Sequence, residues 1–224
     1  MAITTEIPNL KSLIAEFMEK MAAHAPPELL QTLGTELGTL AASGIAHRAL
    51  PVGGRAPGFS LPEARGGVIT LAAELAKGPV VVTFYRGGWC PFCDLQLRAY
   101  QSILSEIHGL GAQLIAISPQ TPDYALSDTE KKALTFPVLS DVHQVVARQY
   151  GLVFKLSPAL QALQVQFGNP MPKFNGDDSW ELPMPGTFVL DKNGVVQLAH
   201  VDTDYTRRLE PSALLDALRA FRGQ

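Results

Sequence analysis

Along the first 50 residues, apolar side chains recur at the three- and four-residue spacing of amphipathic helices. One stripe comprises Leu10, Leu13, Ile14, Phe17, Met18 and Met21. A second stripe follows the helix-start signal Pro26-Pro27-Glu28 and comprises Leu29, Leu33, Leu37 and Leu40. We therefore predict a helical hairpin over residues 1–50 as an N-terminal extension. A stretch rich in Pro and Gly joins it to a core domain over residues 51–224.

In the core domain, short apolar runs alternate with helical patterns. Val80 to Tyr85 and Gln113 to Ser118 are rich in apolar and β-branched residues and predict buried strands. Helical spacing from Pro91 to His108 lies between them, which predicts a parallel βαβ unit. The later predicted elements are helices at Leu126 to Leu134 and Val142 to Tyr150, a strand at Phe136 to Leu139, a hairpin over Thr187 to His200 and a helix over Pro211 to Phe221.

Residues 152–182 interrupt this alternation. They contain several prolines and the turn-forming run Asn175-Gly176-Asp177-Asp178, and we interpret them as an insertion with one short helix at Pro158 to Gln166. The alternation elsewhere is typical of an α/β fold with a mixed central sheet flanked by helices.

Composition narrows the class of partner. With 46% hydrophobic and 17% charged residues, the 224-residue chain can bury a sizeable core. A net charge of -3 argues against a broad basic surface for nucleic acid or for anionic membranes. The first residues lack the pattern of a signal peptide, and no apolar run approaches the roughly 20 residues of a membrane span. We expect a cytoplasmic protein that acts on small molecules or on other proteins.

The two cysteines lie together in Trp89-Cys90-Pro91-Phe92-Cys93. A bridge between them closes too small a loop to stabilise the fold, so a reactive pair or a metal site is the better interpretation. Pro91 is typical of a first helical position, which places Cys90 at a helix N-terminus where a thiolate is favoured. Cys93 follows almost one turn later as the resolving thiol.

Metal binding is the main competing use of such a pair. A structural zinc site needs four ligands, and the histidines at 24, 47, 108, 143 and 200 show no paired spacing. We therefore expect neither a metal nor a cofactor.

Three neighbouring residues are further candidates for the site. Arg86 either stabilises a thiolate or forms an exposed surface ion pair. Tyr85 and Trp89 either form an apolar substrate-binding rim beside Cys90 or belong to the core.

Three motifs in combination resemble the peroxiredoxin-like branch of the alkyl hydroperoxide reductase and thiol-specific antioxidant (AhpC/TSA) family. They are Phe84 to Cys93, Ile115 to Gln120 and Phe136 to Asp141, and the resemblance extends from Val52 to Arg219. It implies a thioredoxin-like fold in which Cys90 attacks a peroxide, becomes a sulfenic acid and is resolved by Cys93 as a disulfide. Thioredoxin or a similar dithiol would then reduce the pair.

The sequence departs from that family at two places. Gly87 stands where ordinary peroxiredoxins carry a Thr or Ser that holds the peroxide. Where they carry an arginine on a later strand, this chain has a stretch around Pro185 that is similar to the cis-proline loop of thioredoxin-like reductases. Pro185 then faces the cysteines and binds a partner peptide, or simply begins a strand. Arg207 or Arg208 supplies the missing cation, or both lie on a solvated surface.

Three functions follow from these observations. The first is a thiol-dependent peroxidase that reduces hydrogen peroxide or organic hydroperoxides through Cys90 and Cys93. The second is a thioredoxin-like protein disulfide oxidoreductase that uses the same pair. The third is a non-catalytic interaction module in which the N-terminal hairpin forms a homodimer or binds a partner. For the hairpin itself, packing onto its own core is the alternative to self-association.

Overall fold

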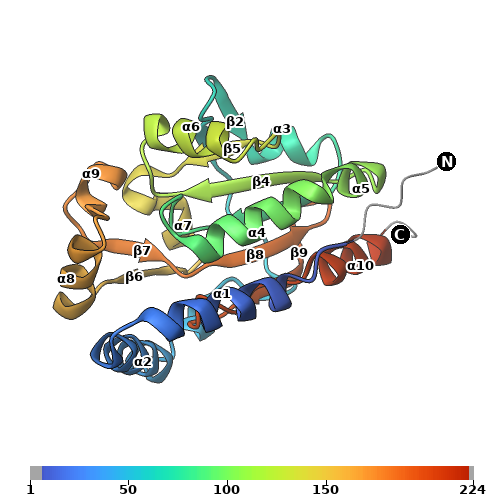
Figure 1. Cartoon of the computed structure of the whole chain (residues 1–224). Helices are drawn as coiled ribbons and strands as arrows, with labels where there is room; N and C mark the ends of the chain where they lie inside the picture. The colour runs from blue at the N-terminus through green and yellow to red at the C-terminus, as the bar shows by residue number, and fades with distance from the viewer. Residues whose placement is uncertain (1–6, 222–224) are drawn as a thin grey trace.

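The computed structural model describes residues 7–221 and has a central five-stranded mixed sheet in the order β5-β4-β3-β8-β9 (Figure 1). Strands β3 (Val80–Phe84), β4 (Gln113–Ser118) and β5 (Val138–Ser140) are parallel. Strands β8 (Gly186–Leu190) and β9 (Val196–Val201) continue the sheet in antiparallel pairs. The predicted α/β fold with a mixed sheet is therefore confirmed.

Side chains of the central strand, β3, alternate between two cores on opposite faces of the sheet, because successive residues of a strand point to opposite faces. Val81 packs under α4 (Pro91–Ser102), α5 (Leu104–Gly109) and α10 (Pro211–Phe221). Val80, Val82 and Phe84 pack on the opposite face, and the elements there are η1 (Ile45–Arg48), α3 (Leu71–Leu75) and α7 (Val145–Gln149). Both faces are thus covered, which explains why the strand is apolar at nearly every position.

Most of the other elements agree with the sequence prediction, but two parts of the core differ from it. The helix expected from Pro91 to His108 is two helices, because Ile103 leaves the helical conformation (φ -106°, ψ 13°). A small hairpin of β1 (Ser60–Pro62) and β2 (Val68–Thr70) precedes α3 and was not predicted, since three-residue strands carry too few alternations to register. Helix α6 covers Pro122–Lys131, and η2 covers Val142–Gln144. Within residues 7–221, no helix has the length and apolarity needed to cross a bilayer.

The two N-terminal helices, α1 (Leu10–His24) and α2 (Pro27–Ala42), pack mainly on different parts of the body (Figure 1). Helix α1 lies along α4, and its first turn is capped by the Glu210 carboxylate, which accepts hydrogen bonds from Leu10 N at 3.0 Å and Lys11 N at 2.6 Å. Helix α2 contacts η1 and α8 instead, and none of its residues is fully buried. It is therefore the most loosely held helix of the extension.

The insertion is more ordered than the sequence indicated. Helix α8 spans Pro158–Gln166 as predicted, and α9 (Met171–Asn175) follows it. Strands β6 (Val153–Lys155) and β7 (Glu181–Pro183) pair antiparallel and close the insertion at its base.

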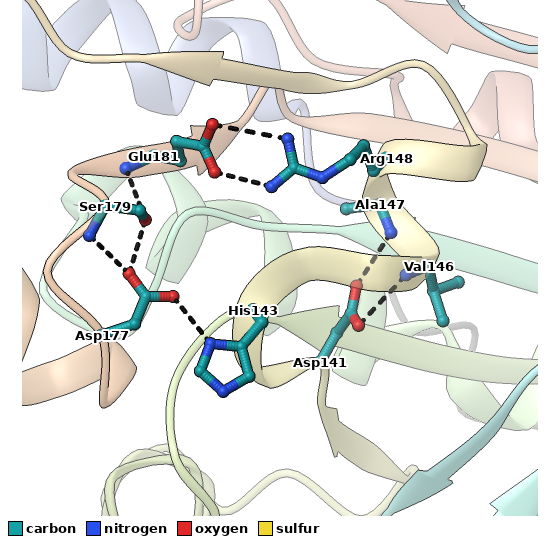
Figure 2. A network of polar contacts seen from close by, with 8 residues as sticks. All are labelled: Asp141, His143, Val146, Ala147, Arg148, Asp177, Ser179 and Glu181. Atoms are coloured by element: carbon teal, nitrogen blue, oxygen red, sulfur yellow. Dashed lines mark hydrogen bonds and ion pairs between the residues drawn. The ribbon is translucent and has the colours of Figure 1, made fainter.

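Polar contacts join the insertion to the turn before α7 (Figure 2). The Arg148 guanidinium meets the Glu181 carboxylate at 2.6 Å, and His143 Nδ1 lies 3.4 Å from Asp177 Oδ2. The Asp141 carboxylate accepts hydrogen bonds from the amides of Val146 and Ala147 at 3.1 and 2.8 Å and so caps the start of α7. Burial raises the pKa of Asp141 above its ordinary value, although these amides partly offset the shift.

We predict that Asp141→Ala destabilises the fold, because two buried amides lose their acceptor. The free energy of unfolding should fall by about 2–4 kcal/mol, which urea denaturation measures. Asp216→Ala is the control, since Asp216 forms only an exposed ion pair with Arg219, and it should cost less than about 0.5 kcal/mol. Equal stability of both variants would contradict the capping role.

Candidate active site

Strand β3 delivers the chain to a tight turn that ends at the first cysteine. Cys90 is the N-cap of α4 (φ -88°, ψ 113°), and Pro91 opens the helix. The turn is tied to the α6 side of the fold, because Gly88 N donates to Gln120 Oε1 at 2.8 Å and Lys132 Nζ donates to Gly88 O at 3.3 Å. Neighbouring elements thus fix where the Cys90 sulfur lies.

Gly87 has a structural reason to be glycine. Its φ of 144° lies in the region that side chains rarely adopt. A Cβ at this position would also collide with the Trp89 indole around Nε1. The hydroxyl residue that the family resemblance places here therefore has no room, and an indole N–H occupies the neighbourhood instead.

The two sulfurs differ in their position relative to a cavity. Both cysteines are free and buried. Cys90 lines a cavity beside the N-terminus of α4, whereas Cys93 is fully buried in the core between α4 and the sheet and does not line the cavity. A molecule that enters the cavity thus meets Cys90 first.

Arg86 lies in the same wall as Cys90 and is almost completely buried, so it is not an exposed surface ion pair. Its Nη1 is 4.0 Å from Cys90 Sγ. The guanidinium stacks between the rings of Trp89 and Tyr205, at 4.9 and 4.4 Å from the ring centroids. This stacking holds a positive charge beside the sulfur.

Arg208 supplies a second cation, on the other sulfur. Its Nη2 lies 3.5 Å from Cys93 Sγ, and its Nε donates to Tyr205 O at 2.6 Å. Arg207 is different, because it is exposed and lies 3.6 Å from the carboxylates of Asp202 and Asp204. Of the two arginines that the sequence offered, Arg208 therefore reaches the site.

A buried polar network that the sequence did not reveal orients Arg208. Arg208 Nη1 donates to Gln96 Oε1 at 2.7 Å, and Gln96 Nε2 donates to Tyr100 Oη at 3.1 Å and to Thr187 Oγ1 at 3.2 Å. The Thr187 hydroxyl also lies 3.0 Å from that of Thr83. The one available signal was a polar Gln96 on the apolar face of the helix, three residues after Cys93.

The helix N-terminus alone would favour a negative charge on Cys90, but the surroundings of the two sulfurs favour it on Cys93. Burial raises the pKa of Cys93, but the hydrogen bond from Cys90 and the guanidinium charges of Arg208 and Arg86 outweigh burial and lower it well below the ordinary value. Burial raises the pKa of Cys90, and the hydrogen bond and negative charge shared with Cys93 raise it further. These opposite directions favour the negative charge of the pair on Cys93 and the proton on Cys90, whereas the sequence predicted the thiolate at Cys90.

The cavity that Cys90 lines has a volume of about 470 Å³ and is mainly apolar. One wall is helix α2, through residues that include Leu29, Leu33, Leu37 and Leu40. The opposite wall belongs to the insertion, where Leu156, Leu160 and Phe167 face the same space. We call this space the Cys90 cavity.

Two of the expected rim residues lie elsewhere. Trp89 lines the Cys90 cavity, but Tyr85 is buried in the core beside Cys93 and is not part of the wall. Pro185 is buried directly before β8, also outside the wall. All peptide bonds of residues 7–221 are trans, so the expected cis-proline is absent from this part of the chain.

Comparisons with known proteins agree with the fold. A sequence model of the AhpC/TSA family matches residues 52–199. The chain is 29% identical to chloroplastic peroxiredoxin Q of Sedum lineare over 73% of each chain, and 29% identical to that of Gentiana triflora over 74% of this chain. In the second case it spans 63% of the relative, less than two thirds. The crystal structure of peroxidoxin BcpB from Mycobacterium tuberculosis superposes with a TM-score of 0.61 at 23% identity, covering 77% of this chain and 98% of that one.

We predict that Arg208→Met raises the pKa of the Cys93 thiol, because the cation that lowers it is removed. The thiolate should then form at higher pH than in the wild type, which a pH titration of thiolate absorbance at about 240 nm measures. Arg207→Met is the matched control and should leave the titration unchanged, because Arg207 contacts neither sulfur. Identical titrations for Arg208→Met and wild type would contradict the role of Arg208.

Proposed function

The chain belongs to the AhpC/TSA family, and we propose that it is a thiol-dependent peroxidase in which Cys90 reacts with the hydroperoxide and Cys93 resolves the product. The observation that carries this proposal is the layered arrangement of the pair. Cys90 opens onto a cavity, Cys93 lies directly behind it, and each sulfur has its own guanidinium.

The reaction begins with proton transfer inside the pair. The Cys90 proton passes along the hydrogen bond to the Cys93 thiolate, so that Cys90 attacks the terminal peroxide oxygen as a thiolate. The O–O bond breaks, and the released alkoxide or hydroxide takes up a proton from solvent. The peroxide is thereby reduced to an alcohol or to water, and Cys90 is oxidised to a sulfenic acid.

The second step uses the cation at Cys93. Arg208 favours loss of the Cys93 proton again, and the thiolate attacks the Cys90 sulfur. The S–S bond forms, and the departing hydroxide takes up the proton and leaves as water. An external dithiol of the thioredoxin type then supplies the two electrons that restore both thiols.

Arg86 has a distinct part in the first step. Its guanidinium lies beside Cys90 rather than Cys93, where negative charge develops on the leaving oxygen. A fixed buried cation stabilises that charge without reorganisation.

The protein disulfide oxidoreductase remains the competing function, and two features count against it. Cys90 is 1% exposed, so a folded protein disulfide has little access to its sulfur. Pro185 is buried, so its backbone has little access to an extended peptide. The homodimer and the cytoplasmic location stay predictions.

We predict that pre-reduced wild-type protein reacts with hydrogen peroxide in a fast single-turnover phase, followed by tryptophan fluorescence in stopped flow. Cys90→Ser should abolish this phase, because it removes the attacking sulfur. Cys93→Ser should keep a reactive Cys90, because it removes the neighbouring charge that raises the pKa of Cys90 and leaves Arg86 beside the sulfur. The reaction should then stop at the sulfenic acid, which dimedone traps, and turnover with dithiol should be lost.

The same proteins distinguish a peroxidase from a protein disulfide oxidoreductase. Slow oxidation by every peroxide, combined with rapid exchange with an oxidised protein disulfide, would refute the peroxidase. A sulfenic acid that dimedone traps at Cys93 of a Cys90→Ser variant, formed at the wild-type rate, would refute the assignment of the two sulfurs.

A further inference from the structure

The Cys90 cavity is much larger than hydrogen peroxide. Its volume of about 470 Å³ falls within the roughly 300–1,000 Å³ of pockets that hold small organic ligands. Its walls on α2 and in the insertion are mainly leucines and phenylalanines, with a few polar side chains such as Glu36 and Gln164 among them, and the apolar side chains offer no hydrogen bonds to so small and polar a molecule. Burial of an apolar group against the same walls is favourable, because it removes apolar surface from water.

The part of the cavity around the reactive sulfur, which we call its polar end, is lined by Arg86 and Trp89. Trp89 Nε1 and Arg86 Nε are buried donors without a hydrogen-bond partner among the described residues. Both side chains line the cavity together with Cys90, and they stack on each other. Buried donors are rarely left without an acceptor, and the oxygens of a hydroperoxide are acceptors of the right size for this end.

We propose that the Cys90 cavity selects hydroperoxides that carry a large apolar group, a specificity that rests on the proposed peroxidase function. The peroxide oxygens meet Cys90, Arg86 and Trp89, and the apolar group lies between α2 and α8. Electrons move as in the general reaction: Cys90 is oxidised to the sulfenic acid, the O–O bond breaks, and the apolar group leaves as its alcohol after taking up a proton.

One of the two selecting walls lies outside the part of the chain that the family shares. Helix α2 precedes residues 52–199, which the AhpC/TSA family model matches, whereas α8 lies within them. No residue of α2 is fully buried, so this wall can yield to admit a bulky molecule at modest cost in packing. Substrate choice is thus separable from the chemistry of the cysteines.

We predict that wild-type protein has a higher kcat/KM for cumene hydroperoxide than for tert-butyl hydroperoxide, and a higher value for both than for hydrogen peroxide. Leu33→Trp fills the cavity from α2 and should lower the ratio of the cumene hydroperoxide value to the hydrogen peroxide value roughly tenfold or more. The matched control is Gln31→Trp on the same helix, which adds the same ring at an exposed position outside the wall and should leave the ratio unchanged.

A second measurement keeps the test independent of how Leu33→Trp folds. The product of cumene hydroperoxide, 2-phenyl-2-propanol, should inhibit the reaction of wild-type protein with hydrogen peroxide competitively. Lack of inhibition, or a wild-type preference for hydrogen peroxide, would overturn the selectivity while leaving the peroxidase intact. Failure of every peroxide to oxidise Cys90 would instead refute the proposed function.

The polar end is tested separately by Trp89→Phe, which keeps a ring beside Arg86 but removes the indole N–H. We expect kcat/KM to fall roughly tenfold for all three peroxides, with the ratio between them unchanged. A wild-type rate for every peroxide in Trp89→Phe would show that the indole donates no hydrogen bond to the substrate.

Discussion

The site depends on the attraction between two buried guanidinium groups and two buried sulfur atoms. Arg86 and Arg208 both lie in the interior, and within residues 7–221 neither forms an ion pair with a carboxylate. A buried guanidinium without a counter-charge is costly, so the thiolate stabilises the arginines as much as they stabilise it. The Arg86 guanidinium also stacks on Tyr205, and the Arg208 guanidinium donates a hydrogen bond to Gln96.

The elements that the sequence predicted are those whose signals are local. The stripe from Leu10 to Met21, the apolar run of β3 and the Pro158 start of α8 each carry period, length and end signals within one segment. The cysteine pair belongs to the same class, because Cys90 and its helix-opening Pro91 are adjacent. The sequence predicted one helix from Pro91 to His108 where the structure has two, because no strong local signal marks the break at Ile103.

The rest of the site required the tertiary fold. Arg208 and Cys93 are 115 positions apart, and nothing near either residue indicates that they meet. The position of the charge also depends on burial, which the pattern around Cys90 does not encode. Likewise, Tyr85 is an aromatic residue at a strand end in the sequence, and only the fold shows that it faces the core rather than the cavity.

The segment between β9 and α10 contacts both the cysteine site and the N-terminal extension. Arg208 contacts Cys93, and two residues later Glu210 caps the first turn of α1. The attachment of the N-terminal extension and the electrostatics of the thiols therefore share one short stretch of backbone. A change of length in this segment would disturb both together, so natural variation in loop length should gather elsewhere on the surface and spare this junction.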